Sequence, residues 1–258
     1  MTQTTLDSLL VQMRSRLEAQ GINLWGVARI EDFDGWQSPK GRLSSCSSTC
    51  RSAIVIGTGG RDHWQYLVEK QGEPGRRGSN PLDRWSQHSL SREVEFLASH
   101  GYRSKALFPF ARKPVNFLRL AEIAGIGKLS PVVPFLLHPR YGPWISLRGA
   151  LLLEEALEPT GELEDFAPCH FCHAPCLEAC PVDTYGPHGK FDLRSCGEHR
   201  HQGGCEGGCE VRRACPVGSS ERYGPEEERF RHRHSLPILR RHFGLGLWKW
   251  LPARLRRF

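Results

Sequence analysis

The sequence predicts a layered α/β or α+β domain, followed by a cysteine-rich module and a basic tail. Three observations predict this class. Apolar segments with strand and helix periodicity alternate up to about residue 160, and eight of the ten cysteines lie between Cys169 and Cys215. Nine Lys or Arg but no Asp or Glu occur from Arg229 to Phe258. We therefore expect an α/β domain at 1–162, a metal-binding domain at 163–224 and a tail at 225–258.

The first predicted elements are a helix and two strands. Apolar residues recur at helical spacing over Leu6–Gln20, and Gly21 is suited to end that helix. Strands are predicted at Ile22–Arg29 and Cys50–Gly57, the second as the continuous apolar run of a strand buried on both faces. The segment 59–80 is rich in Gly and Arg, which predicts a loop.

Two more helices and three more strands complete the predicted domain. Asn80 and Pro81 have the residue types of an N-cap and first helical position, and Gly101 ends this helix. Pro114 is predicted to open another helix that Gly125 stops. The strands are predicted at Ser104–Phe110, Val132–Leu137 and Trp144–Leu153.

Composition and charge restrict the setting of the protein. The net charge is +7, and the basic tail accounts for the excess. No stretch has the apolar length of a membrane span, and charged residues interrupt the leucines of the first 20 residues, unlike a signal peptide. We expect a cytoplasmic protein, in which ten cysteines indicate metal binding rather than disulfides.

The cysteines form two motifs, each of which ends in Cys-Pro, at Cys180-Pro181 and Cys215-Pro216. Thiolates are the usual ligands of iron–sulfur clusters, and in two-cluster ferredoxins the cysteine before proline binds the other cluster. The spacing therefore predicts two 4Fe–4S clusters with interleaved ligand sets. Set one is Cys169, Cys172, Cys176 and Cys215, and set two is Cys180, Cys196, Cys205 and Cys209.

Zinc is the alternative metal. Histidines near the cysteines could complete tetrahedral sites, and together with the basic tail they would suit a zinc-stabilised nucleic-acid-binding protein. Eight cysteines with two Cys-Pro endings fit two clusters more economically, so nucleic acid is not an expected partner. The second motif has the longer spacings, so a missing cluster would be the one held by Cys196, Cys205 and Cys209.

Three motifs before the cysteines carry a family resemblance. Gly125-Ile-Gly-Lys-Leu-Ser, Leu137-His-Pro-Arg-Tyr-Gly-Pro-Trp and Leu147-Arg-Gly-Ala-Leu-Leu-Leu resemble, in this order, epoxyqueuosine reductases and corrinoid reductive dehalogenases. The resemblance implies a nitroreductase-like α/β sandwich core that binds cobalamin, followed by a double 4Fe–4S ferredoxin-like module. It also implies an oxidoreductase in which electrons pass from the clusters to cobalamin.

The sequence departs from the epoxyqueuosine reductase pattern in two places. The acidic proton donor of that family lies three residues before a proline. The residue three positions before Pro114 is Ala111, whose side chain cannot donate a proton. Where the family has a C-terminal helical-repeat domain, the sequence continues with the basic tail, so we do not expect that domain here. We therefore expect a reductase-like protein that is not a true epoxyqueuosine reductase. The alternative is a ferredoxin-like electron carrier without a substrate of its own.

The resemblance places candidate cobalamin-binding residues in two loops. Glycines would permit close approach, Lys128 and Ser130 could bond corrin amides or phosphate, and His138 could reach cobalt. The full candidate set is Gly125, Gly127, Lys128, Ser130, His138 and Tyr141. The alternative is a helix cap and a turn that any α/β domain contains.

The tail mixes Arg and Lys with Trp and Leu. Such a segment could contact an anionic membrane surface or dock an acidic low-potential electron donor, such as a flavodoxin- or ferredoxin-like protein. We expect instead that its apolar side chains pack on the body, because Pro237 and Pro252 should interrupt any long helix.

Overall fold

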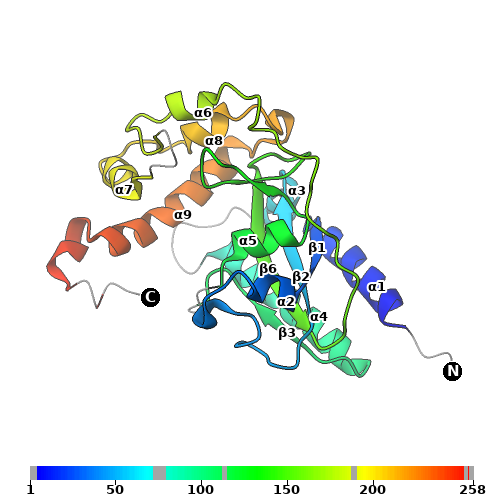
Figure 1. Cartoon of the computed structure of the whole chain (residues 1–258). Helices are drawn as coiled ribbons and strands as arrows, with labels where there is room; N and C mark the ends of the chain where they lie inside the picture. Colours follow the sequence, from blue (N-terminus) through cyan, green and yellow to red (C-terminus); the bar gives the residue numbers. More distant parts are fainter. Residues whose placement is uncertain (1–4, 72–79, 112–114, 187–190, 253–254, 256–258) are drawn as a thin grey trace. The chain divides into compact units, whose positions relative to one another are not determined.

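The computed structural model describes residues 5–71, 80–111, 115–186, 191–252 and 255 (Figure 1). They form two compact units. Unit 1 comprises the described residues of Met1–Leu129 and Ile145–Phe166, and unit 2 those of Ser130–Trp144 and Ala167–Phe258. Because the chain enters unit 2 twice, the units do not coincide with the three consecutive segments expected from the sequence, and those limits stay a prediction.

Unit 1 is built on an antiparallel sheet with the strand order β1-β2-β6-β3. All eight residues of β2 are buried, as its apolar run predicts. In the register Val27 pairs with Ile54, and Ile54 pairs with Leu151. The strands are β1 Leu24–Arg29, β2 Ser52–Gly59, β3 Ser104–Leu107 and β6 Ile145–Leu153.

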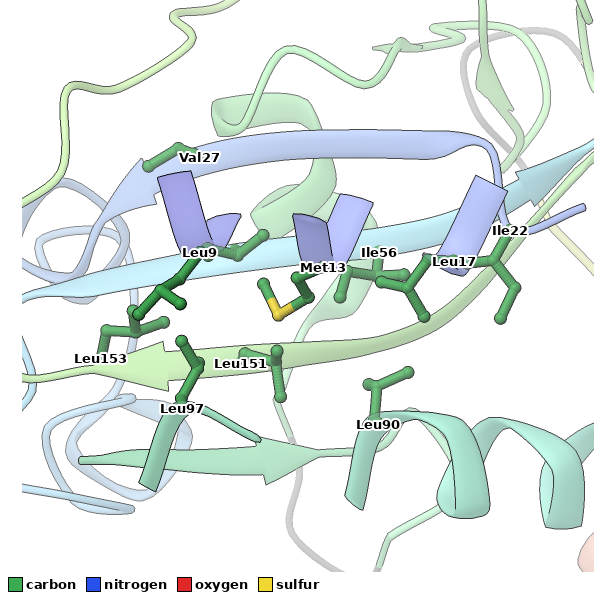
Figure 2. Close-up of a cluster of buried hydrophobic side chains, with 11 residues drawn as sticks. Leu9, Met13, Leu17, Ile22, Val27, Ile56, Leu90, Leu97, Leu151 and Leu153 are labelled. Carbon is green, nitrogen blue, oxygen red and sulfur yellow. The ribbon is translucent and has the colours of Figure 1, made fainter. Parts of the chain in front are cut away.

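The main core of unit 1 lies where α1 and α4 pack on this sheet. Figure 2 shows Leu9, Met13 and Leu17 of α1 among Ile56 and Leu151 of the strands, with further leucines from α4. Their spacing of four residues puts the α1 side chains on one helix face. The helices are α1 Leu6–Glu18, α2 Ile30–Asp34, α3 Asp62–Gln71, α4 Pro81–Ser99 and α5 Phe117–Ile123, with η1 Pro39–Gly41 and a short strand β4 Lys128–Leu129.

Capping residues fix the helix ends. The Asn80 side chain accepts a hydrogen bond from Leu82 N at 3.1 Å, as an N-cap does. After α5, Gly125 has φ +70°, and Ile126 N donates to Ala121 O at 2.9 Å, which closes the helix. These ends agree with the sequence prediction, and the mixed α+β class with a small antiparallel sheet is confirmed.

Two predictions in unit 1 were wrong or lie outside the described residues. Part of the predicted 59–80 loop is the helix α3, which buries His63 and Leu67, and its remainder at 72–79 is outside the described residues. The helix was not predicted because most of the residues of this segment are polar and few are apolar. Pro114, expected to open a helix, also lies outside the described residues, and α5 is capped by Asn116.

Unit 2 consists mainly of short helices and turns. Helix α6 contacts α8, and α7 contacts α9. Its small core contains Val133, Cys180 and Val211. The predicted strand at 132–137 is reduced to β5, because Ser130 Oγ accepts from the backbone N–H groups of Val132 and Val133 and forms a turn. The elements are β5 Leu136–Leu137, α6 Pro175–Glu178, α7 Leu193–His201, α8 Glu210–Ala214, η3 Ser219–Glu221, α9 Pro225–Phe243 and η4 Gly246–Trp250.

The beginning of the tail is a long helix, contrary to expectation. Helix α9 continues through Pro237 and ends at Gly244, whose φ of +66° is left-handed. Pro237 is exposed, so water can satisfy the carbonyl group that loses its helical partner. Among the helices of the described residues, none is both long and apolar enough to cross a membrane.

Candidate metal centres

The four cysteines of set one come from three parts of unit 2. Cys169 and Cys172 share a turn in which Cys172 N donates to Cys169 O at 3.4 Å. Cys176 lies in the single turn of α6, which follows Ala174 in the left-handed conformation with φ 54°. Cys215 follows α8 as its C-cap. The contact between α6 and α8 thus brings a late cysteine to three early ones.

A cavity lies among the set one thiols. All four cysteines line it, and the rest of its wall is apolar except for Ser130. The other lining residues are Val132, Val133, Phe135, Leu137, Pro168, Ala174, Pro175, Pro216 and Val217. A wall of this kind excludes water and supplies sulfur as its principal ligand atom.

The thiols of set one act on one another electrostatically. Burial raises the pKa of the Cys176 thiol, and Cys215, Cys169 and Cys172 raise it further. Burial also raises the pKa of Cys215, with Cys169 and Cys172 adding to the effect and a backbone hydrogen bond at Val217 opposing it. Metal binding requires deprotonated cysteines, so this grouping favours a bound positive charge.

Ser130 has a defined role beside set one. Its Oγ accepts from two backbone N–H groups, of Val132 at 3.2 Å and Val133 at 3.3 Å, and lies 3.3 Å from Cys169 Sγ. Both lone pairs of the hydroxyl are therefore used, so its single proton is directed to the sulfur of Cys169. The sequence placed Ser130 in a cobalamin site, whereas the structure places it against a cysteine of set one.

Set two is assembled around α7 and α8. Cys196 lies within α7, Cys209 is the N-cap of α8, and Cys205 between them has φ 53°. Cys180 is buried, and its sulfur accepts from Thr184 N at 3.3 Å. Burial raises the pKa of Cys196, which Cys209, Cys180 and Cys205 raise further. The same four cysteines that the spacing predicts are therefore neighbours.

Arg200 distinguishes set two from set one. Its side chain is buried, with 7% of the residue exposed, and it bonds to Cys196 and acts electrostatically on Cys209 and Cys205. Its Nη2 also donates to Ser235 Oγ at 3.0 Å and to the His232 carbonyl. The described residues place no carboxylate within ion-pair distance of Arg200, so the thiols of set two are the groups beside it that could carry a negative charge once deprotonated.

Tyr185 and Arg212 also belong to the surroundings of the cysteines. Burial raises the pKa of the Tyr185 phenol, with Cys209, Cys196 and Cys180 contributing. The Arg212 guanidinium lies 5.3 Å from the ring centroid of Phe135. Sequence reasoning missed these residues and Arg200. For Arg200 a signal existed, because it follows Cys196 by four residues and so lies on the same face of α7.

As they stand, no three His, Cys, Asp or Glu side chains of the described chain are arranged to hold a metal ion. All ten cysteines, each within the described residues, are free thiols. The thiols thus form two neighbouring groups without converging as a single-ion site requires.

The candidate cobalamin residues are divided between the two units. In unit 1, a Cβ on Gly125 would lie 2.2 Å from Gly161 O, so chain packing as well as its left-handed φ requires glycine there. Lys128 forms an ion pair with Glu162 at 3.4 Å. Gly127 is buried in the same loop, where Leu129 N donates to Glu122 Oε1 at 2.8 Å.

In unit 2, His138 and Tyr141 lie in a turn that the sequence predicted. His138 Nδ1 accepts from the backbone N–H groups of Arg140 at 3.1 Å and Tyr141 at 3.2 Å, which leaves the proton on Nε2. Burial and Arg140 lower the pKa of His138 to about 4. In this conformation Nε2 is a donor rather than a metal ligand, and Tyr141 is buried against the His138 ring.

Comparison with solved structures identifies the fold. An epoxyqueuosine reductase bound to an epoxyqueuosine-modified tRNA-Tyr stem loop superposes with a TM-score of 0.61 at 18% identity, over 87% of this chain and 69% of the other. The epoxyqueuosine reductase of Streptococcus thermophilus gives a TM-score of 0.61 at 16% identity, over 96% of this chain and 78% of that one.

The chain has the epoxyqueuosine reductase fold. A catabolic reductive dehalogenase shares this fold, with a TM-score of 0.53 at 15% identity over 87% of this chain and 33% of the dehalogenase, so the chain spans about one third of that enzyme. No family model and no curated protein matches the sequence. The resemblance predicted from the motifs is thus confirmed at the level of the fold.

Proposed function

We propose that this chain is a redox protein that holds two 4Fe–4S clusters, one on each thiol set, and passes electrons to a corrinoid or similar acceptor. The observation that carries the proposal is the grouping of eight cysteines into two sets of four, each drawn from both halves of the motif. The epoxyqueuosine reductase fold supports a redox role. A reductive dehalogenase of similar fold carries out B12-dependent dehalogenation, which supports the corrinoid part.

The surroundings of the thiols fit iron–sulfur clusters. An apolar cavity with four sulfurs suits a cluster that takes thiolate ligands and excludes water. The buried Arg200 would be uncompensated beside neutral thiols, but it is matched by the negative charge of a thiolate-bound cluster. Binding would reorient the thiols, which do not converge as they stand.

Such a cluster accepts and releases single electrons, and the chain's own residues would set how readily this occurs. Hydrogen bonds and positive charge near the sulfurs stabilise the reduced, more negative form. Ser130 and the N–H of Thr184 supply the hydrogen bonds, and Arg200 supplies the charge. The apolar wall around set one limits the access of water.

Metal and sulfide analysis of protein purified without oxygen tests the clusters. We expect about eight irons and about eight sulfides per chain, because each cubane contains four of each. A variant Cys46→Ala, which alters a cysteine outside both sets, should retain them all. Stoichiometric zinc without sulfide would reject the proposal in favour of a zinc protein.

The acceptor is tested separately. Titration of the cluster-loaded protein with reduced cobalamin should produce a spectral change and retain corrinoid on gel filtration. Absence of both would favour the second candidate, an electron carrier without its own substrate. Ala111 motivates that candidate, because this exposed position has no acidic side chain to protonate a substrate.

A further inference from the structure

A second cavity of unit 2 lies between the C-terminal end of α7 and one face of α9. It has a volume of about 560 Å³. Arg229, His232, Arg233 and Arg240 line it from α9, at spacings that put them on one helix face. Arg200 and the glycine-rich loop that follows α7 form the opposite wall.

The cavity has a large excess of positive charge. Four arginines line it against a single acidic residue, Glu206, which leaves an excess of three positive charges. In the described part of the chain, none of Arg229, Arg233 and Arg240 has a carboxylate within 4.0 Å. Surface arginines of folded proteins are often paired, so this cluster is left for an anion from outside the chain.

Unpaired buried nitrogen atoms also indicate an anion site. Arg200 Nε, Arg240 Nε and His232 Nε2 are buried and have no hydrogen-bond partner among the described residues. Burial and the charges of Arg200, Arg212 and Arg213 lower the pKa of His232 to about 3, so this ring stays neutral at physiological pH. A bound anion would offset the repulsion among the guanidinium groups, and His232 would stay neutral beside it.

We propose that this cavity binds a small ligand with a diphosphate or triphosphate group. Guanidinium groups match phosphate oxygens in geometry and charge, and Arg229, Arg233 and Arg240 supply cations for a diphosphate apart from Arg200, which bonds to Cys196. The volume lies within the range of small-molecule sites. Gly203, Gly204 and Gly207 leave one wall without bulky side chains, so phosphate can approach the backbone.

The lining also limits what the ligand can be. Apart from the two histidines it contains no aromatic side chain, and Leu236 is its main apolar residue. A nucleobase would therefore find no Trp, Tyr or Phe ring to stack on, so recognition is mainly of the phosphate groups. This site shares Arg200 with the surroundings of set two, but its test does not depend on the identity of the metal.

Isothermal titration of the full-length protein, purified without oxygen, provides the test. Pyrophosphate and ATP should bind at one site per chain with similar affinity, and adenosine should not bind. Arg229 and Arg233 are exposed, so the double variant R229Q/R233Q should fold and bind pyrophosphate at least tenfold more weakly. The control R194Q removes an exposed arginine of α7 that does not line the cavity, and should change binding less than twofold.

Several results would overturn the proposal. These are no pyrophosphate binding, equal binding by wild type and R229Q/R233Q, or equal weakening by R194Q. Binding of poly-glutamate but not pyrophosphate, with the same dependence on Arg229 and Arg233, would replace it with a docking site for an acidic protein. If the double variant does not fold, each single variant and R240Q give the same comparison by titration.

Discussion

Set one faces a cavity lined by apolar side chains, whereas the thiols of set two lie beside the buried Arg200 guanidinium. Two histidines of unit 2, His138 next to Leu137 of the cavity and His232 in contact with Arg200, also differ in the number of nearby cations. Burial and one arginine lower the pKa of His138 to about 4, while burial and three arginines lower that of His232 to about 3. Two similar cysteine sets are thus held in different electrostatic environments, which would give their clusters different reduction potentials, with set two reduced first.

The largest expected effect concerns which cysteines belong together. C215A should remove the same cluster as C169A, and C180A the same cluster as C209A, with about four irons lost each time because each set is an independent ligand group. Iron analysis and electron paramagnetic resonance of the reduced variants provide the measurement. If C215A and C209A removed the same signal, the interleaved grouping would be wrong.

Removing the charge beside set two should make the two environments more alike. R200Q should lower the reduction potential of the set two cluster by roughly 60 mV, or about 1.4 kcal/mol for one electron, because the reduced cluster loses a neighbouring cation. Redox titration followed by electron paramagnetic resonance reports both clusters. R194Q is the matched control, and an equal shift in it would point to a general charge effect.

His138 follows Leu137 of the set one cavity, and it allows the stability of this part of unit 2 to be tested by changing the pH. Its folded pKa is below its unfolded value, so the unfolded state binds the proton first and stability falls as the pH drops from about 6.5 toward 4. Since the ring is only partly buried, we expect a loss of about 1 kcal/mol between pH 7 and 5. H138N keeps an acceptor for the two N–H groups but cannot titrate, so its denaturant midpoint should depend less on pH.

The smallest expected effect is at Ser130. S130A removes the hydroxyl proton from Cys169, and should lower the potential of the set one cluster by roughly 20 mV, equivalent to about 0.5 kcal/mol, without moving that of set two. S130T, which keeps the hydroxyl, should retain the wild-type potential. A shift in both clusters would show that the substitution acts through packing instead.

Much of the fold follows from local patterns in the sequence. The buried run of β2 and the Asn80-Pro81 start of α4 were predictable because burial and capping depend on neighbouring residues. Helix α3 was missed because its apolar positions are few and lie in a Gly- and Arg-rich segment. Pro237 within α9 misled the prediction because exposure to solvent decides whether a helix tolerates proline.

Some residues of the candidate sites could be predicted from the sequence, and others became apparent only in the structure. The sequence predicts the two interleaved cysteine sets because, in two-cluster ferredoxins, the cysteine before proline binds the other cluster, and the assignment of these sets as cluster ligands stays a prediction. Arg200 could not be ranked above the other arginines without knowing that α7 is covered by α9, since Ser235 and the His232 carbonyl hold it in place. The contact between Ser130 and Cys169, 39 residues farther along the chain, likewise became visible only in the structure.

The interleaving of the cysteines has a consequence for biosynthesis. Cys180 precedes the other members of its set along the chain, and Cys215, the last cysteine of the module, lies with the three earliest of the module. A ribosome delivers residues in order, and domains fold as they emerge. The first set of thiols therefore waits, unfinished and open to oxidation, until the whole module has left the ribosome, so cluster loading would be a late step in maturation.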